Sequence, residues 1–488
     1  LAFVQQPVNT SQNTAMTASP SVRAIDANSN IDLDYSTVIL ITSTGTMTGS
    51  PIGVAPSSGV SSFVGIIHTS IGTFNLNASS GSLSSVNSNN FVISTFTYIS
   101  GDFRPLNSTD LSYNGDWEYY NGSSWIAVPD NKAPQNTATT VGRVIINSFV
   151  TGGGSNAKAY NCDFIIQSGG QLNILANDTP PVAAEMLSAG KKIEVLSGGI
   201  LSIEGDIDVA ATASIIVREG GEMILNQPSI NYNHPMWEGT EIFEGGSTVS
   251  ILDWGFTGAG SGSLINGAST PTISANSNGY IFGNLIVDIT AAKFTNTWSL
   301  VGGSLGIVNL CENNFDINNE STNFIYGATN RTGTNGFVVN GNLTIFDGPF
   351  SFGFNFDNNP FNHQFIINGN FECASNDVLK VNHVNGALTN NLSGSVTFKG
   401  DVIVANTVTS FLNEGGTTTG NTRMSVNFEG GTLASPKIID IAPTAVAMNM
   451  NLKNSGYRKL RTQDLILNSV TNYTSTFTVE TGSTLDFS

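Results

Sequence analysis

The chain is built from short runs in which apolar and polar residues alternate, separated by Gly, Asn, Ser and Thr. Alternation with a period of two is typical of β-strands that bury one face, and the separating residues favour turns. Helical periodicity is nearly absent. The one candidate is residues 182–192, which follow Pro180 and Pro181 and are expected to form two turns of helix at most. The pattern therefore predicts an all-β chain.

The first 95 residues contain strand-like runs at intervals of roughly 8–12 residues, which is typical of a small β-sandwich. The runs are residues 1–7, 21–27, 37–43, 59–68, 72–80 and 90–96. We therefore expect residues 1–95 to form one sandwich domain.

The order of phrases in this segment resembles bacterial immunoglobulin-like repeats of surface proteins. FVQQP (3–7) comes first, VRAIDANSN (22–30) follows, and GTFNLNASSGSL (72–83) completes the series. The resemblance implies an immunoglobulin-like β-sandwich. In that family such domains act as spacers on long extracellular chains.

Residues 96–140 are irregular and rich in aromatic residues. Trp117, Tyr119, Tyr120 and Trp125 supply more ring area than a solvated loop normally exposes. We expect this segment to be a linker and a cap on the exposed end of the next domain. A stalk or a ligand platform is the alternative.

From about Val141 the chain becomes a loose repeat of two or three alternating runs joined at Gly. Turn glycines 169, 198, 220 and 245 are 29, 22 and 25 residues apart, and glycines 341, 369, 400 and 430 are 28, 31 and 30 residues apart. A period in this range predicts one solenoid coil per repeat. A seven-bladed propeller is the main competitor, but its blades need four strands in about 40–45 residues.

A solenoid explains why Gly and Asn recur at the turns, since each coil bends where residues must tolerate positive φ. Stacking at about 4.8 Å pairs every strand with its neighbours and buries a continuous apolar column. For residues 141–488 we expect about 12–15 coils and a rod of roughly 60–70 Å. No cap is visible at the carboxy-terminal end, so we expect the solenoid either to continue into further sequence or to be closed by a partner.

Composition removes several classes of function. The chain has 488 residues, 11% of them charged, and a formal net charge of −18. The acidic field repels polyanions, so nucleic acid is not an expected partner. No apolar run is long enough to span a membrane as a helix, so no transmembrane segment is expected. The sequence begins at Leu1 without an initiator Met or a signal peptide, and we expect it to be a piece of a longer protein.

The run SGDFRPLNSTDLSYNGDWEYYNGSSWIAVPDNKAPQ (100–135), followed by SGGQLNI, GNLTI and VETGSTLDF, resembles large secreted surface proteins of Bacteroidota. The resemblance covers most of residues 100–488 and implies a parallel β-helix, with a right-handed coil. Such proteins are typically exported by the type IX secretion system, and many are adhesins, including gliding-motility adhesins. The carboxy-terminal sorting domain of that group is lacking within these residues, so the export route is implied by kinship alone.

Carboxylates near one part of the repeat are the strongest catalytic candidates. Asp206 and Asp208 are two residues apart and so lie on one strand face, Glu194 and Glu204 flank them, and Arg218 and Glu219 follow in the next coil. Polysaccharide lyases and hydrolases on parallel β-helices use stacked carboxylates of this kind. A solvated outer strand face has the same pattern, and we favour that interpretation.

The remaining candidate sites are weaker. Asp26, Asn28, Asn30, Asp32 and Asp34 alternate like the opening of a calcium loop, but Asx-rich turns look the same. GGSLG (302–306) places Ser304 in a turn rather than a nucleophile elbow.

Histidines, cysteines and basic residues give no further site. The four histidines, 68, 234, 363 and 383, are scattered, and we expect solvated or locally satisfied rings. Cysteines 162, 311 and 373 are expected to be small core residues. Residues 458–461 contain the densest basic patch, Arg458, Lys459 and Arg461, which we expect at a solvated strand edge. We assign no catalytic residue, metal ligand or cofactor.

The sequence therefore predicts a non-enzymatic, extracellular structural or adhesive segment of a bacterial surface protein. Its expected partners are the type IX secretion or cell-surface anchoring machinery and polysaccharide or other surface ligands. A β-helix polysaccharide lyase or hydrolase is one alternative. A passenger bound by export or motility machinery is another.

Overall fold

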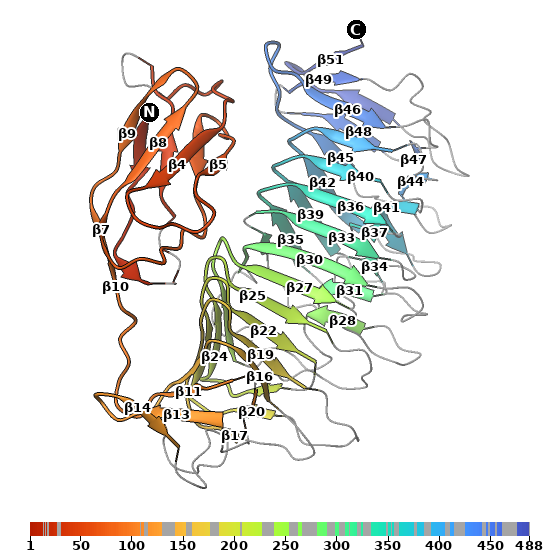
Figure 1. Cartoon of the computed structure of the whole chain (residues 1–488). Helices are drawn as coiled ribbons and strands as arrows, with labels where there is room; N and C mark the ends of the chain where they lie inside the picture. Colours follow the sequence, from red (N-terminus) through yellow and green to blue (C-terminus); the bar gives the residue numbers. More distant parts are fainter. Residues whose placement is uncertain are drawn as a thin grey trace.

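The computed structural model (Figure 1) describes the chain from Leu1 to Phe487 apart from a number of short segments. Those segments are residues 13, 15, 17–18, 27–30, 108, 112–115, 129–141, 153–158, 176–184, 205–206, 227–238, 253–261, 266–280, 290–297, 302–307, 312, 320–323, 326–332, 348–349, 353, 356–360, 375–377, 385–391, 406–409, 414–424, 442–445, 448, 454–455, 461–475 and 488.

The amino-terminal part folds into three small sheets around one apolar core. The sheets have the strand orders β1-β3-β6, β2-β10-β7 and β5-β4-β8-β9, and all pairs are antiparallel except β2 with β10. The strands are β1 (Ala2–Gln5), β2 (Thr10–Ser11), β3 (Ser21–Arg23), β4 (Ile39–Ser43), β5 (Ile52–Val54), β6 (Val60–Ser62), β7 (Gly72–Phe74), β8 (Leu76–Ser80), β9 (Leu83–Asn87) and β10 (Phe91–Ser94). Alternate residues of β4 and β8 are buried, as the sequence pattern predicts. We call this part the sandwich; its immunoglobulin-like topology stays a prediction.

A linker leads from the sandwich to the first layer of the solenoid. There β11 (Phe103–Pro105) pairs in parallel with β15 (Val144–Ile146), and β13 (Trp117–Tyr120) and β14 (Trp125–Ala127) extend the same sheet antiparallel. β12 (Thr109–Asp110) begins the neighbouring sheet. The Trp117 side chain is only 1% exposed and belongs to the solenoid core, so this segment covers the apolar interior at that end.

The rest of the chain winds as a solenoid whose strands pair in parallel with those of the coils before and after (Figure 1). One face is a single 14-stranded sheet. It comprises β12, β16 (Phe149–Gly152), β19 (Gln171–Ile174), β22 (Ile200–Ile203), β25 (Glu222–Leu225), β27 (Thr248–Leu252), β30 (Asn284–Ile289), β33 (Phe315–Asn319), β36 (Leu343–Asp347), β40 (Phe371–Cys373), β43 (Val402–Val404), β46 (Lys437–Ile441), β49 (Tyr457–Leu460) and β51 (Thr484–Asp486). All but β12 lie after residue 140, which gives 13 layers, within the range that the repeat period predicted.

Two further faces are each divided between an earlier and a later sheet. The second face contains, besides β11, β13 and β14, the strands β15 (Val144–Ile146), β18 (Phe164–Ile166), β21 (Lys192–Val195), β24 (Ser214–Val217) and β26 (Thr240–Phe243), and then β29 (Ile281–Phe282), β32 (Val308–Cys311), β35 (Gly333–Val339), β39 (Phe361–Ile367), β42 (Leu392–Phe398), β45 (Ser425–Phe428), β48 (Asn449–Leu452) and β50 (Thr476–Val479). The third contains β17 (Ala159–Tyr160), β20 (Glu185–Leu187) and β23 (Ile207–Val209), and then β28 (Gly262–Ile265), β31 (Trp298–Val301), β34 (Phe324–Ile325), β37 (Phe350–Ser351), β38 (Phe354–Asn355), β41 (Val378–Val384), β44 (Ser410–Asn413) and β47 (Val446–Ala447).

These sheets confirm the all-β class, and their strand order is that of a solenoid. The described residues contain no α-helix, and none of them forms a helix able to cross a membrane. The short helix expected within residues 182–192 is wrong where that segment is described, because β20 and β21 pair with neighbouring coils there. The segment forms strands because its backbone amide and carbonyl groups gain hydrogen-bond partners in the coils on both sides. Handedness of the coil stays a prediction.

In-register stacking aligns identical positions of successive coils into apolar columns. Leu172 pairs with Leu201, and the same row continues through positions 223, 249, 285, 315, 343, 371, 402 and 439 of the 14-stranded sheet. All of these side chains are fully buried. The core is therefore one narrow apolar column along the solenoid axis.

Glycine is required at the corners for two different reasons. Gly169, Gly198 and Gly220 have φ angles of 80°, 71° and 76°, so the early corners use the left-handed conformation that the repeat predicted. Gly369 does not have a positive φ, yet a Cβ added to it would lie 2.2 Å from the carbonyl oxygen of Gly341 in the coil before. The later corners up to Gly400 therefore need Gly because successive backbones approach too closely for any side chain.

Beside these later corners, asparagine side chains bond one coil to the next. The backbone amide of Asn342 donates to Oδ1 of Asn314 at 3.0 Å, and the backbone amide of Asn370 donates to Oδ1 of Asn342 at 2.9 Å. Asp401 continues the series by donating to Asn370 at 3.0 Å and accepting from the Ile438 amide at 2.8 Å. We call this series the asparagine ladder. It satisfies amides that the strand ladders leave free at the corner.

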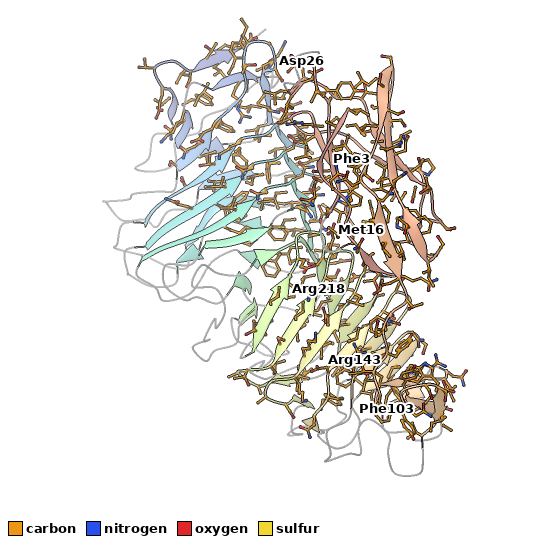
Figure 2. All side chains as sticks on the ribbon, turned by 90° about the vertical axis from the view of Figure 1, so that its left-hand side faces the viewer. Phe3, Met16, Asp26, Phe103, Arg143 and Arg218 are labelled. Carbon is orange, nitrogen blue, oxygen red and sulfur yellow. The ribbon has the colours of Figure 1, made fainter. Side chains whose placement is uncertain are left out.

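The sandwich lies along the flank of the solenoid rather than extending from its end (Figure 1). In the view of Figure 2, Arg143 and Phe103 mark the first layers of the solenoid, and Met16 of the sandwich lies near Arg218, several coils farther on. Ser19 and Gly65 of the sandwich donate hydrogen bonds to Glu219 of the solenoid, so the two parts are in direct contact.

Replacing Gly369 and Gly169 by Asn, one at a time, distinguishes the two reasons for Gly at the corners, which are close approach of the backbones and positive φ. Asn tolerates positive φ, and open space surrounds the Cβ position of Gly169, so Gly169→Asn should cost less than about 1 kcal/mol of unfolding free energy. Gly369→Asn should cost about 3 kcal/mol or more, because its Cβ overlaps the Gly341 carbonyl. Denaturant unfolding of both variants measures the difference; equal losses would contradict the close-approach explanation.

Candidate functional site

The candidate carboxylates lie on three different faces of the solenoid. Glu194 belongs to β21 of the second face, Glu204 follows β22 of the 14-stranded sheet, and Asp208 lies in β23 of the third face. Glu204 accepts a hydrogen bond from Nδ2 of Asn173 in the preceding coil, at 3.1 Å. Asp206 lies outside the described residues. The backbone positions of Glu194, Glu204 and Asp208 are therefore distributed over three faces rather than stacked on one.

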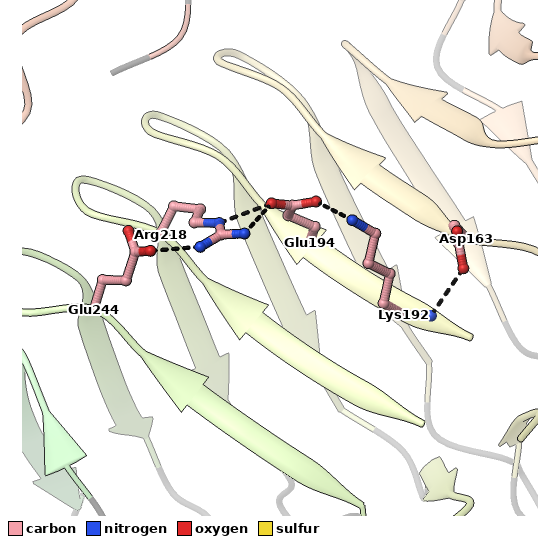
Figure 3. Close-up of polar contacts among 5 residues, drawn as sticks. All are labelled: Asp163, Lys192, Glu194, Arg218 and Glu244. Carbon is pink, nitrogen blue, oxygen red and sulfur yellow. Dashed lines mark hydrogen bonds and ion pairs between the residues drawn. The ribbon is translucent and has the colours of Figure 1, made fainter. Parts of the chain in front are cut away.

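Glu194 is instead the centre of an ion-pair series that runs across successive coils (Figure 3). Arg218 lies 2.7 Å from Oε1 of Glu194 and 2.5 Å from Oε1 of Glu244, and Nζ of Lys192 lies 2.6 Å from Oε2 of Glu194. Oδ1 of Asp163, one coil earlier, accepts the backbone amide of Lys192 at 3.1 Å. The series therefore joins several layers on the outer surface of the second face.

Charge compensation sets the pKa directions within this series. Burial acts to raise the pKa of Glu194, but hydrogen bonds from Lys192 and Arg218 outweigh it and lower that pKa. Burial acts to lower the pKa of Arg218, and the bonds to Glu244 and Glu194 raise it. Both groups are thus held in their charged forms. The arrangement is suited to bonding coils together rather than to donating a proton.

Glu219, the residue next to Arg218, lies between the solenoid and the sandwich and is only 6% exposed. Its Oε1 accepts hydrogen bonds from the Ser19 hydroxyl and, at 3.1 Å, from the Gly65 amide. Burial raises the pKa of Glu219, and repulsion from Glu244 adds to this against the two hydrogen bonds. Sequence reasoning placed this residue on the outer face but could not show what covers it.

Arg458 corrects the prediction of a solvated basic edge, because it is fully buried inside the solenoid. Residues 399–401 join β42 to β43, whereas the longer segment 429–436 joins β45 to β46. At this widened corner the Arg458 guanidinium donates to the carbonyl oxygens of Phe398, Gly400 and Glu429. Burial lowers the pKa of Arg458 to about 10, against the attraction of Asp401 and Glu429. Of the other two basic residues, Lys459 is partly exposed and Arg461 lies outside the described residues.

Glu241 is a buried acid that the sequence pattern did not single out. It pairs with Ile215, whose side chain faces the core, so Glu241 takes an inward position in β26. The residue is partly exposed as a whole, but its Oε1 is buried and has no hydrogen-bond partner among the described residues. Burial raises the pKa of Glu241 to about 8. The Glu241 carboxyl is therefore neutral at pH 7 and charged only in more alkaline solution.

The aromatic segment packs onto the linker. The Trp125 ring meets Tyr98 of the linker edge to face at 4.9 Å and Tyr120 at 5.3 Å, while the Arg104 guanidinium lies 4.3 Å from the Trp125 ring centre. Arg104 also pairs with Glu118 at 2.7 Å. The rings meet at interplanar angles of 50–80°. They form a small cluster that holds the linker against the cap, not a flat platform.

The calcium and nucleophile candidates are exposed or lie outside the described residues. Asp26, Asp32 and Asp34 are exposed, and Asn28, Asn30, Ser304 and His234 fall in segments that are not described. An antiparallel bridge joins Ile25 to Ile31, on either side of residues 27–30. Within the described part of the chain, no group of three or more His, Cys, Asp or Glu residues is arranged to hold a metal ion.

The described histidines are separate from one another. Nε2 of His68 lies 2.7 Å from the Ser43 hydroxyl, and burial lowers the pKa of that ring. His363 and His383 lie in β39 and β41, on different faces of the solenoid. The three cysteines are buried, which confirms their assignment to the core.

Comparison with known proteins gives no relative from which a role could be transferred. No protein-family model, curated protein or solved structure matches the chain significantly.

Replacing Glu241 by Gln should remove a pH dependence of stability. Because the folded-state pKa of Glu241 is raised, its neutral form favours folding below the ordinary carboxyl pKa, and this stability is lost as the pH rises to about 8. Glu241→Gln keeps the shape without the charge, so its melting temperature should fall less than that of the wild type between pH 5 and pH 9. Glu480→Gln is the matched control, because the ion pair of Glu480 with Lys453 at 3.8 Å is solvent-exposed and contributes little, and it should keep the pH dependence of the wild type.

Replacing Arg458 by Lys should leave the carbonyl oxygens of Gly400 and Glu429 without the donors that the guanidinium supplies, whereas the Phe398 carbonyl also accepts the Glu429 amide. Each unsatisfied buried group costs about 1–3 kcal/mol, so a total loss of about 2 kcal/mol or more is expected in denaturant unfolding. Lys459→Ala, at the adjacent outward position, should change stability by less than about 0.5 kcal/mol. Equal stability of Arg458→Lys and the wild type would contradict the role assigned to the guanidinium.

Proposed function

We propose that the chain is a non-enzymatic structural and adhesive segment of a bacterial cell-surface protein, acting outside the cell. The observation that carries this proposal is the continuous 14-stranded parallel sheet. Thirteen steps of about 4.8 Å correspond to a rod of roughly 60 Å in which each layer is bonded to the next. A rod of this kind holds whatever it carries at a fixed distance from its anchor.

The disposition of polar groups supports a scaffold. The asparagine ladder and the ion-pair series around Glu194 both run from coil to coil, so these groups resist separation of the layers along the rod. A rod under tension at a cell surface is loaded in that direction. Removing any one layer contact leaves the neighbouring contacts in place, which suits a mechanical role.

The outer row of the 14-stranded sheet supports the adhesive part of the proposal. Thr344 pairs with Glu372, and Glu372 pairs with Ile403, so polar and apolar side chains recur at one-layer intervals on an outward row. Glu372 and Ile403 are exposed. Repeated weak contacts with a polysaccharide or another surface ligand would add through multivalency.

The cellular setting rests on the sequence resemblance. We propose an immunoglobulin-like spacer for the sandwich, export by type IX secretion, and a role like that of gliding-motility or other adhesins of Bacteroidota. The anchoring or secretion machinery would then be the partner of the longer protein. Antiparallel pairing in the sandwich and the parallel solenoid after it are compatible with this setting.

Polysaccharide binding and turnover, measured side by side, test this proposal. The chain should be retained by part of a polysaccharide panel in co-sedimentation, while reducing-sugar and unsaturated-product assays give no turnover with or without calcium. Turnover that is lost in Asp206→Ala but kept in the control Glu372→Ala would replace the scaffold by a carboxylate-dependent enzyme. Neither retention nor turnover on the panel would contradict the adhesive part.

A further inference from the structure

The sandwich is attached to the solenoid first through a permanent clasp on the linker. Asp102 is fully buried and pairs with Arg143 at 2.5 Å. Oδ2 of Asp102 also accepts the Ile99 amide at 2.9 Å, and Arg143 donates to the Thr97 carbonyl at 2.9 Å. Phe96 packs on an outward apolar cluster of the early coils. Because these contacts come from the first coil, this clasp holds residues 96–102 against that end of the solenoid.

The second attachment is small and lies several coils farther along. Oε1 of Glu219 accepts hydrogen bonds from the Ser19 hydroxyl and the Gly65 amide. One coil on, Gly246 lies so close to Val64 of the sandwich that an added Cβ would come within 2.2 Å of Val64 Cγ1. The two parts therefore touch closely at this point, with a carboxyl group at its centre.

That carboxyl group has no cationic partner among the described residues. The neighbouring Arg218 is engaged by Glu194 and Glu244, and Oε2 of Glu244 accepts the Glu219 amide at 3.1 Å, which brings a second carboxylate close. The contacts from the sandwich come from a hydroxyl, an amide and an aliphatic side chain, none of which titrates near neutral pH. Closing this contact on an ionised Glu219 thus buries a negative charge beside another one.

We propose that the contact of Glu219 with Ser19 and Gly65 is a pH-dependent latch, which holds the sandwich against the solenoid in acid and releases it as the pH rises. On release the sandwich turns about the junction between β10 and Phe96, since the clasp keeps the linker itself in place. The open arm reaches farther from the flank than the closed arm in Figure 1.

The direction of the pH dependence follows from the buried carboxyl. Burial and repulsion from Glu244 raise the pKa of Glu219 in the closed form, whereas the open form returns it to solvent and to its ordinary value. The closed form therefore binds the proton more tightly. Its stability is complete below the ordinary carboxyl pKa and is lost as the pH rises through the raised value.

Distance measurements on the whole chain test the latch. Fluorophores are attached at Leu33→Cys and Leu433→Cys, which are 65% and 77% exposed, while the three native cysteines are buried. Energy transfer between them should fall, and the distance distribution should broaden, between pH 4.5 and pH 8. Glu219→Gln, which stays neutral, should keep the pH 4.5 value throughout. Glu222→Gln, whose partner is Ser250 of the solenoid itself, is the control and should respond as the wild type.

Three outcomes would overturn the latch. One is the same distance distribution at both pH values in the wild type. Another is a pH response that survives in Glu219→Gln. The third is a change in distance accompanied by loss of β-sheet circular dichroism, since that would report unfolding of the sandwich rather than its release.

Discussion

Close backbone stacking between successive coils is the constraint on which the structure depends. Each coil is too thin to bury its own apolar side chains, so folding gains its core only when layers meet in register. The corners limit how closely layers can meet. Hydrogen bonding between the strands of adjacent coils continues past a corner only if the corner brings backbone carbonyl and amide groups of the two coils together. Gly341 and Gly369 satisfy this limit by having no side chain at the point of contact. The asparagine ladder then satisfies the amides beside them.

Charged residues are few, and three of them show how charge holds parts of the molecule together. Arg218 pairs with carboxylates of two other coils. The Arg458 guanidinium donates hydrogen bonds to backbone carbonyl oxygens at the widened corner. Glu219 differs, since it faces another domain and its charge is not compensated. The first two contacts are stable in their charged forms, whereas the third becomes weaker when its group ionises. The same narrow rod can thus be rigid along its axis and adjustable at its flank.

The strands and the coils could be predicted from the sequence because they follow from local periodicity. Alternation predicts strands, and a turn glycine every 22–31 residues predicts coils. The face of a strand is harder to predict. In Glu241–Phe243, alternation alone permits Ile242 to face inward, but the register with Ile215 and Val217 places Glu241 and Phe243 inside and leaves Ile242 43% exposed. The prediction for Arg458 was wrong for a related reason. A buried donor is needed there only because of the widened corner in the preceding coil, which the local sequence does not show. The burial of Glu219 could not be predicted from the sequence, because it depends on where the sandwich lies against the solenoid.

Hydrogen exchange at the corner amides tests the role of close stacking most directly. The amides of Gly341, Gly369, Asn342 and Asn370 each donate to a group in the preceding coil, so we expect slow exchange at all four, at rates close to those of the buried strands beside them. Exchange at these corners as fast as in an unstructured peptide, while the strands remain protected, would contradict that role, because the strand hydrogen bonds would then hold the layers together without close stacking at the corners.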